Sequence, residues 1–320
     1  MKQYIELIEH VLKNGTRKEN RTGIDTLSTF NFNYTHDLNT GFPLLTTKEV
    51  SWKNIVIENL WFLSGSKDIS FLQRHGCKFW DPWADEKGNV PSAYGSYWTN
   101  FPVHGAPDAL ENRECPAFNN QIEWVLNEMR RNPMSRRMVV SAWAPGNAQT
   151  SKLPPCHAMF VFNVQNKKVG MVANTRPGQG VPGEPTPLYK KQLCLHLLQR
   201  SADVALGIPY NLAGYAFITH LFAQMSGLDV GVFGHSLVDA HIYTKKADEK
   251  ESEYDHVPGL LEQINRAPRE LPTLSIDPTI RDLKDIAGLL DPKLTTAEIM
   301  DRFKLSNYNP HKALKFKVAV

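Results

Sequence analysis

Residues 153–162 read Leu153-Pro154-Pro155-Cys156-His157-Ala158-Met159-Phe160-Val161-Phe162 and place a thiol between two prolines and an apolar run. The apolar run predicts a strand, and the prolines stiffen the backbone where the chain enters it. Cys156 is therefore expected at the mouth of a strand. A free cysteine is most often a small buried apolar residue, which is the simplest interpretation of Cys156 on its own. A nucleophilic role requires positive charge or hydrogen-bond donors near the sulfur, because the thiolate is the reactive form.

The composition is that of a globular protein with balanced charge. The chain has 320 residues, of which 42% are hydrophobic and 22% charged, with 36 basic and 33 acidic side chains. This length suits one large domain or two modest ones, and the net charge of +3 means that any anion site must be local. The four cysteines form no C-x-x-C pair, the N-terminus lacks an apolar signal segment, and the longest apolar region, 212–225, is too short for a bilayer. A reducing cytoplasm is the expected location.

The spacing of apolar residues outward from residues 153–162 predicts a mixture of helices and strands. Helices are predicted at residues 4–12, 52–63, 121–130 and 207–226. Strands are predicted at residues 30–34, 138–143, 193–198 and 230–243, besides the run after Cys156. Residues 172–187 carry three glycines and four prolines and predict a loop. Residues 244–300 are expected to be helical and peripheral, and the alternation in residues 314–320 predicts a strand-like tail.

Arginines occur where an anion would stabilise them. Arg136 and Arg137 lead directly into a predicted strand, where a guanidinium is costly unless it meets an anion. Arg21, on a glycine-containing turn, and Arg200, after another strand, could join them in holding a phosphate by bidentate hydrogen bonds. Guanidinium groups so placed would also favour the thiolate of Cys156.

Other side chains fit a flat, polar ligand. His241 and Tyr243 lie two positions apart on a predicted strand and therefore face the same side. Asn211 offers one donor and one acceptor group, which suits an imide edge such as that of a pyrimidine. Glu58 lies in a largely apolar helix; a surface position is usual for glutamate, but burial would raise its pKa and allow proton transfer. The aromatic residues between 79 and 98 could form a satellite core or stack on a heterocycle.

These residues resemble, over most of the chain, the folate-dependent thymidylate synthase family. Each motif is short, but all of them occur in the order of the family. The motifs are Arg21-Thr22-Gly23, Glu58-Asn59-Leu60-Trp61-Phe62-Leu63, Trp80-Asp81-x-Trp83-Ala84-Asp85, Tyr94-Gly95, Ser135-Arg136-Arg137, Pro155-Cys156-His157, Gln199-Arg200-Ser201-x-Asp203-Val204, Gly207-x-Pro209-Tyr210-Asn211, Asp239-Ala240-His241-x-Tyr243 and Val318-Ala319-Val320.

The resemblance implies an α+β fold in a single thymidylate synthase-like domain over residues 1–320. Its core would be a large twisted sheet, mixed and mostly antiparallel, covered by helices, and two copies would pair sheet to sheet as a homodimer. A small variable subregion is expected at about 66–130 and a loop excursion at about 168–190. This excursion and the region 277–301 are longer than in compact members of the family, and Phe79 and Ser51 also depart from its pattern.

The resemblance further implies the reductive methylation of dUMP to dTMP by 5,10-methylenetetrahydrofolate, with release of dihydrofolate and no metal. Cys156 would attack C6 of the base and form a covalent adduct, while Glu58 and Tyr94 would move protons. Asn211 favours dUMP over dCMP, because relatives that act on cytosine nucleotides carry a carboxylate at this position. The other catalytic residues that the resemblance implies are Arg200 and Asp203.

The family pattern also implies the ligand-binding residues. Arg21, Arg200 and Ser201 would hold the phosphate, and Arg136 and Arg137 would reach it from the other subunit. His241 and Tyr243 would contact the 3′-hydroxyl. The rest of the nucleotide site would be His157, Gln199, Asp203 and Asn211. The folate site would comprise Phe79, Trp80, Trp83, Asp203, Leu206, Gly207 and Tyr210, with Lys48 near a polyglutamate tail and Ala319 and Val320 closing over the ligands.

Two other functions stay open on the sequence alone. A dUMP hydroxymethylase shares every step up to the exocyclic methylene and then adds water in place of hydride; Trp80 and the tail 318–320 favour a dry site and hence methylation. A nucleic-acid-binding module could use the same arginines and tryptophans, but the balanced charge and the lack of a basic stripe count against it. We therefore expect an enzyme whose partners are dUMP, a folate and a second copy of the chain, with no membrane and no nucleic acid.

Overall fold

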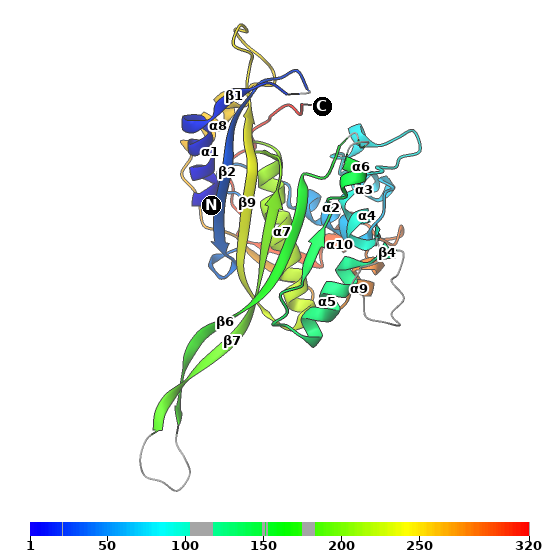
Figure 1. The fold of residues 1–320 in the computed structure, drawn as a ribbon, viewed down its shortest axis with the longest axis vertical. Coiled ribbons are helices and arrows are strands. Elements are labelled where there is room, and N and C mark those ends of the chain that lie inside the picture. The colour runs from blue at the N-terminus through cyan, green and yellow to red at the C-terminus, as the bar shows by residue number, and fades with distance from the viewer. Residues whose placement is uncertain (21, 103–117, 149–150, 152, 175–182, 320) are drawn as a thin grey trace.

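The computed structural model describes residues 1–20, 22–102, 118–148, 151, 153–174 and 183–319. A mixed sheet of seven strands organises this part of the chain, in the order β1-β2-β9-β7-β6-β5, with β8 paired to β9 (Figure 1). The pairs β7–β9 and β8–β9 are parallel, and the other pairs are antiparallel. Its strands are β1 (Thr16–Lys18), β2 (Thr26–Asp37), β5 (Val139–Ser141), β6 (His157–Asn174), β7 (Gly183–Gln199), β8 (Ala202–Asp203) and β9 (Asp229–Tyr243).

Helices cover the sheet, so the prediction of an α+β fold with a mixed, mostly antiparallel sheet is confirmed. The longer helices are α1 (Lys2–Asn14), α2 (Trp52–Ser64), α5 (Gln121–Arg131), α7 (Gly207–Ser226) and α8 (Val257–Ile264). The shorter ones are α3 (Ser70–Arg74), α4 (Tyr94–Thr99), α6 (Pro145–Ala148), α9 (Leu283–Gly288) and α10 (Thr296–Met300), with 3-10 turns η1 (Leu38–Thr40) and η2 (Asp81–Trp83). Two small antiparallel pairs are β3 (Phe101–Pro102) with β4 (Phe118–Asn119), and β10 (Thr273–Ile276) with β11 (Phe303–Ser306).

Helix α7 is the centre of the hydrophobic core. It contacts β7 and β9 on the side of the sheet and α2 and α5 on the other side. Its apolar residues are therefore buried around most of its circumference, which is the pattern of an internal helix. Full burial of a side chain such as Phe217 or Phe222 contributes about 1.5–3 kcal/mol. Gly227 ends the helix in the left-handed conformation, with φ of 70°, which glycine adopts without strain.

The prediction of a loop excursion at about 168–190 is wrong for the described part of that range. Strands β6 and β7 continue as a paired two-stranded arm that projects from the body (Figure 1). Pro187 is compatible with this arm, because the β7–β9 pairing ends at Gln192 and the missing N–H of the proline therefore breaks no second ladder. Residues 175–182 lie outside the described residues.

The carboxyl-terminal segment also differs from the prediction. Residues 314–319 form no strand, and the segment is held by side chains instead of a ladder. The ring of Phe316 lies 5.1 Å from that of His256, and His256 Nε2 hydrogen-bonds the carbonyl of Lys317 at 2.9 Å. Residues 244–300 contain α8, α9 and α10 but also the strand β10, so the prediction of a helical region holds only in part. No helix among the described residues is both long and apolar enough to cross a membrane.

Candidate active site

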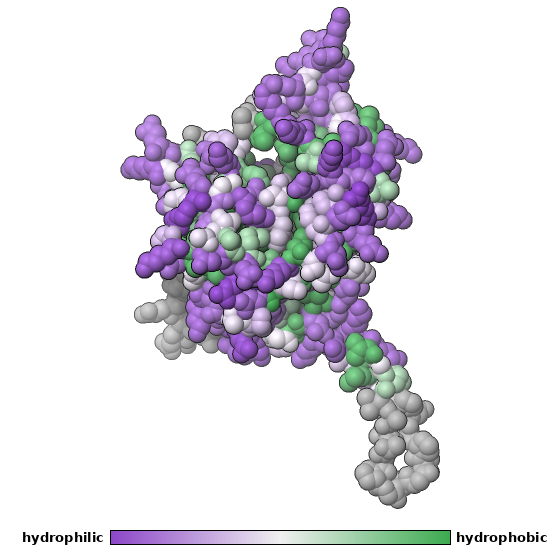
Figure 2. Space-filling model, turned by 180° about the vertical axis from the view of Figure 1, so that it is seen from behind, coloured by the Kyte–Doolittle hydropathy of each residue, from purple (hydrophilic) through white to green (hydrophobic). Residues whose placement is uncertain are grey.

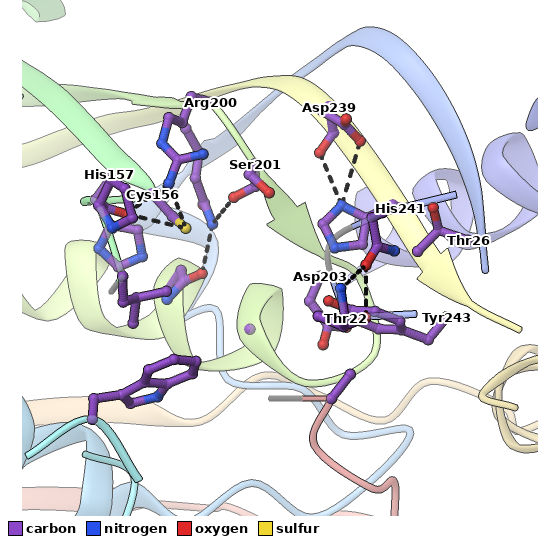
Figure 3. Close-up of a pocket in the computed structure, with 18 of the residues that line it drawn as sticks. Thr22, Thr26, Cys156, His157, Arg200, Ser201, Asp203, Asp239, His241 and Tyr243 are labelled. Carbon is purple, nitrogen blue, oxygen red and sulfur yellow. Dashed lines mark hydrogen bonds and ion pairs between the residues drawn. The ribbon is translucent and has the colours of Figure 1, made fainter. Parts of the chain in front are cut away.

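A cavity of about 590 Å³ lies where strands β6, β7, β8 and β9 meet the start of α7 (Figure 3). Cys156 precedes β6, Gln199 ends β7, Asp203 ends β8 and Tyr243 ends β9. Thirteen residues with predicted site roles line it: Trp83, Tyr94, Cys156, His157, Gln199, Arg200, Ser201, Asp203, Gly207, Asn211, His241, Tyr243 and Ala319. Residues from across the sequence therefore converge on one site.

The remaining predicted residues are placed elsewhere or are not described. Arg21 and Val320 lie outside the described residues. The cavity wall does not include Lys48, Glu58, Phe79, Trp80, Arg136, Arg137, Leu206 or Tyr210.

Cys156 lies beside a guanidinium group. Its Sγ is 3.7 Å from Nη2 of Arg200, and its backbone N–H donates to the hydroxyl of Tyr94 at 3.2 Å. Cys156 is partly exposed, and its sulfur lines the cavity (Figure 3). A positive charge at this distance favours the thiolate over the thiol, so the arrangement meets the requirement for a nucleophile.

The two prolines before Cys156 fix the guanidinium of Arg200. Nε of Arg200 donates to the carbonyl of Pro155 at 3.0 Å, and Nη2 donates to the carbonyl of Pro154 at 2.6 Å. The backbone N–H of Arg200 donates to the carbonyl of Cys156 at 2.9 Å. Two carbonyls on a stiff Pro-Pro segment therefore hold the cation at the sulfur, and its outer face lies over the ring of Trp143 at 5.3 Å.

A partly buried carboxyl group, that of Glu58, lies behind the aromatic wall of the cavity. Nε1–H of Trp80 donates to Oε1 of Glu58 at 2.8 Å, and the ring of Trp80 meets that of Tyr94 edge-on at 5.3 Å. Burial raises the pKa of Glu58 from 4.5 to about 7, and the hydrogen bond from Trp80 offsets part of this rise. Glu58 can therefore hold or release a proton near neutral pH. Trp80 lies between Glu58 and Tyr94, which lines the cavity. The structure therefore places Glu58 in a partly buried position against Trp80, and not on the open surface.

A charged cluster occupies the opposite side of the cavity (Figure 3). Nδ1 of His241 lies 3.4 Å from Oδ1 of Asp239, the amine of Lys18 pairs with the same carboxylate, and Oγ of Ser28 donates to it at 2.9 Å. The hydrogen bond with His241, followed by those from Lys18 and Ser28, holds the pKa of Asp239 well below its usual range. The rings of His241 and Tyr243 are perpendicular at 5.3 Å, as expected for two residues on one face of a strand.

The residues at the start of α7 are ordered by hydrogen bonds. Oδ1 of Asp203 accepts from the backbone N–H groups of Ala205 and Leu206 at 2.9 and 3.0 Å. Lys48 is 5% exposed, donates to the carbonyl of Ala205 at 2.6 Å and lies under the ring of Phe316, 4.7 Å from its centroid. Burial lowers the pKa of Lys48 to about 8. In this structure Lys48 therefore supports the folded chain beside the cavity.

Arg136 and Arg137 lie outside this cavity. Both are exposed, on the segment that leads into β5. A guanidinium on the surface costs little free energy, so the exposed positions of Arg136 and Arg137 do not require an anion within the chain. Phe79 is also exposed, and its ring meets that of Tyr210 at 4.8 Å.

The cavity also contains residues to which the sequence analysis assigned no role: Lys18, Asn20, Thr22, Thr26, Ser151, Leu153, Pro154 and Asp239. For Asp239 a signal was present, because it shares the strand face of His241 and Tyr243 at intervals of two residues. Lys18 could not be found in this way, since its contact with Asp239 spans 221 positions of sequence. Among the described residues no three His, Cys, Asp or Glu side chains are grouped so that they could hold a metal ion.

The chemistry available is nucleophilic addition by a thiol next to a cation, with a proton carrier of raised pKa nearby. The charged and hydroxyl side chains of the cavity suit a phosphorylated sugar, and its aromatic side chains suit a flat heterocycle. A family model described as thymidylate synthase matches residues 2–320 of the chain.

Proposed function

The chain belongs to the thymidylate synthase family, and we propose that it catalyses the reductive methylation of dUMP to dTMP with 5,10-methylenetetrahydrofolate as co-substrate. Enzymes of this family transfer a one-carbon unit and use this folate. The observation that carries the proposal is the thiol of Cys156 within 3.7 Å of the Arg200 guanidinium, in a cavity that also contains Asn211.

The first step is addition of the Cys156 thiolate to C6 of the uracil ring. The sulfur forms a bond to C6, and the π electron pair of the C5–C6 double bond moves towards C5 and O4, so that C5 becomes a nucleophile. The amide of Asn211 is suited to the base, because its oxygen can accept from N3–H and its nitrogen can donate to O4. The second hydrogen bond stabilises the negative charge that develops on O4.

The folate supplies a methylene group, which C5 takes up, and afterwards the hydride that reduces this group to methyl. The aromatic side chains of the cavity fit such a co-substrate, because Trp83 and Tyr94 both line its wall. Glu58 and Tyr94 are assigned to the protons that move to and from the nucleotide and the folate. Loss of the C5 proton is accompanied by cleavage of the bond between the transferred carbon and the folate nitrogen, which leaves an exocyclic methylene on the base. Hydride addition to this carbon shifts the electron pair so that the C6–S bond breaks, which regenerates the Cys156 thiolate and completes dTMP.

The charged side chains of the cavity are assigned to the deoxyribose phosphate. Arg200 and Ser201 line one side of the cavity, and His241 and Tyr243 line the other side. Arg136 and Arg137 are exposed away from it, so we assign them to the phosphate of a second copy in a homodimer. A side chain that reaches the phosphate bound by a second copy must be exposed on its own chain.

The test is product analysis with dUMP and methylenetetrahydrofolate. Reductive methylation predicts dTMP by mass, together with one equivalent of dihydrofolate by its absorbance. Formation of 5-hydroxymethyl-dUMP without dihydrofolate would instead identify the hydroxymethylase reaction, in which water takes the place of hydride. Absence of any nucleotide product from the folded dimer would contradict both.

A further inference from the structure

A buried chain of hydrogen bonds runs from strand β2 to the base-binding amide of Asn211. The hydroxyl of Tyr34 contacts Nδ1 of His235 at 2.7 Å, and Nε2 of His235 contacts Oε1 of Gln199 at 2.9 Å. Nε2 of Gln199 donates to Oδ1 of Asn211, also at 2.9 Å. The first two residues are separated by 201 positions of sequence and meet only because they are direct partners in the β2–β9 ladder.

The hydrogen bonds between Tyr34, His235, Gln199 and Asn211 all have a defined donor and acceptor. Their direction follows from one contact with a backbone carbonyl. Nε2 of Gln199 lies 3.2 Å from the carbonyl oxygen of Ser201, which can only accept. The nitrogen of the Gln199 amide must therefore face Ser201 and Asn211, and its oxygen must face His235. Because that oxygen only accepts, Nε2 of His235 must carry the proton.

The protonation state of His235 decides the direction of its hydrogen bond with Tyr34. Its side chain is fully buried, and burial holds the pKa of His235 well below its usual range, so the imidazole is neutral. A neutral imidazole protonated on Nε2 has a bare Nδ1, which accepts. Tyr34 must then donate its hydroxyl proton to it. Every donor in the sequence Tyr34, His235, Gln199, Asn211 thus points towards the cavity.

We propose that Tyr34 and His235 are positioning residues that fix the orientation of the Asn211 amide, and through it the choice of a uracil over a cytosine nucleotide. The inference rests on the proposed function. With Oδ1 of Asn211 held by Gln199, the amide presents its acceptor for N3–H and its nitrogen for O4 of uracil. Cytosine has an acceptor at N3 and a donor at its exocyclic amine, so it requires the reversed amide.

Reversal of Asn211 is opposed by the chain of hydrogen bonds. It would set two N–H donors, those of Gln199 and Asn211, against each other, and the Gln199 side chain is buried, with 2% exposure. An unpaired buried donor of this kind lowers an equilibrium constant by about tenfold or more. Without Tyr34 the imidazole loses the donor that favours its Nε2-protonated tautomer. The direction of the Gln199 amide then depends on the 3.2 Å contact with the Ser201 carbonyl alone, so the preference for one orientation of Asn211 is weakened.

Equilibrium binding of dUMP and dCMP to the whole protein, by calorimetry, tests the proposal. Tyr34→Phe removes one oxygen atom and is expected to lower the ratio of dUMP to dCMP affinity by about tenfold. Tyr4→Phe is the matched control, because its buried hydroxyl donates to the carbonyl of Val204 at 2.9 Å, outside this chain, and it is expected to leave the ratio unchanged. A Tyr34→Phe protein that folds and keeps the wild-type ratio overturns the proposal.

A second measurement does not depend on any variant or on activity. Nitrogen-15 spectra of histidine-labelled protein should show His235 neutral, with the proton on Nε2. A proton on Nδ1 would reverse the direction of the chain and contradict the proposal, even if dUMP is the substrate. Conversely, a wild-type protein that binds neither nucleotide contradicts the proposed function, whereas a normal preference for dUMP with an unchanged ratio in Tyr34→Phe contradicts only the role of Tyr34 and His235.

Discussion

The two ends of the β6–β7 hairpin share one backbone ladder and differ in almost everything else. At the inner end, where His157 pairs with Gln199, the strands border the cavity. At the outer end, where Lys168 pairs with Tyr189, they form an arm whose apolar side chains are exposed (Figure 2). Those exposed residues are Val169, Met171, Leu188 and Tyr189.

The difference lies in the neighbours. At the inner end β9 pairs with β7, and α7 packs against both strands, so that polar side chains there are held by fixed partners. A shift of register between His157 and Met159 also bends the ladder beside Cys156. The β7–β9 pairing extends no further along the arm than Gln192. A paired backbone therefore supplies shape, whereas the chemistry arises where other elements converge on it.

The largest effect is expected from the thiol at the inner end. Cys156→Ser should lower kcat by at least about 10³-fold, because a serine hydroxyl is rarely ionised without a dedicated base. The measurement is the rate of dihydrofolate formation at saturating dUMP. Cys194→Ser, on β7 and outside the cavity wall, is the matched control and should retain activity. Normal turnover in Cys156→Ser would rule out covalent catalysis by this residue.

The next largest effect is expected from Arg200, whose guanidinium group is held by the carbonyls of Pro154 and Pro155. Arg200→Lys keeps the charge but loses the planar fork that reaches both proline carbonyls, so kcat/KM for dUMP should fall by about 10²-fold. Steady-state kinetics measure this loss. Lys168 is one of several exposed lysines of the arm and offers a control, since Lys168→Arg should change nothing. Equal loss in both variants would mean that the two ends do not differ as described.

Glu58 should set a pH dependence. Glu58→Gln should lower kcat by about 10- to 100-fold and remove the inflection near pH 7 from the pH–rate profile, because the pKa of Glu58 is about 7. Stability provides an independent check. A carboxyl whose pKa is raised on folding stabilises the folded state at low pH, and this contribution is lost between its unfolded value of 4.5 and about 7. A wild-type profile in Glu58→Gln would exclude a proton-transfer role.

The smallest effect is expected at the outer end of the hairpin. The double variant Met171→Ser and Leu188→Ser replaces exposed apolar side chains, so kcat/KM should stay within about twofold and the free energy of unfolding within about 0.5 kcal/mol. Chemical denaturation and the standard assay suffice. A loss of activity comparable to that of Arg200→Lys would show that the arm takes part in the site.

The inner end was largely predictable from the sequence, because Cys156, Arg200, Asn211, His241 and Tyr243 lie within short motifs whose chemistry can be read locally. The arm was not, because most of its described side chains are exposed, and the apolar alternation by which a strand is recognised is weak there. Backbone hydrogen bonds between strands do not involve side chains, so they produce no recognisable pattern in a sequence.

Pairs that depend on strand register were also beyond the sequence. Lys18 with Asp239, and Tyr34 with His235, meet across β-strand partners far apart in the chain, and no local pattern links them. The sequence allowed a surface or a buried position for Glu58, and only the contact with Trp80 in the folded chain shows that it is partly buried. The roles of Arg136 and Arg137 depend on a second copy of the chain and stay predictions.

The most direct test of the central claim is to capture the bond between Cys156 and the base. In 5-fluoro-dUMP the fluorine replaces the C5 proton that must leave, so the adduct should accumulate once the folate carbon is attached. Mass spectrometry of the denatured protein should then show an added mass equal to nucleotide plus folate, carried by the peptide that contains Cys156. An enzyme that turns over dUMP but retains an unmodified Cys156 under these conditions would contradict the account.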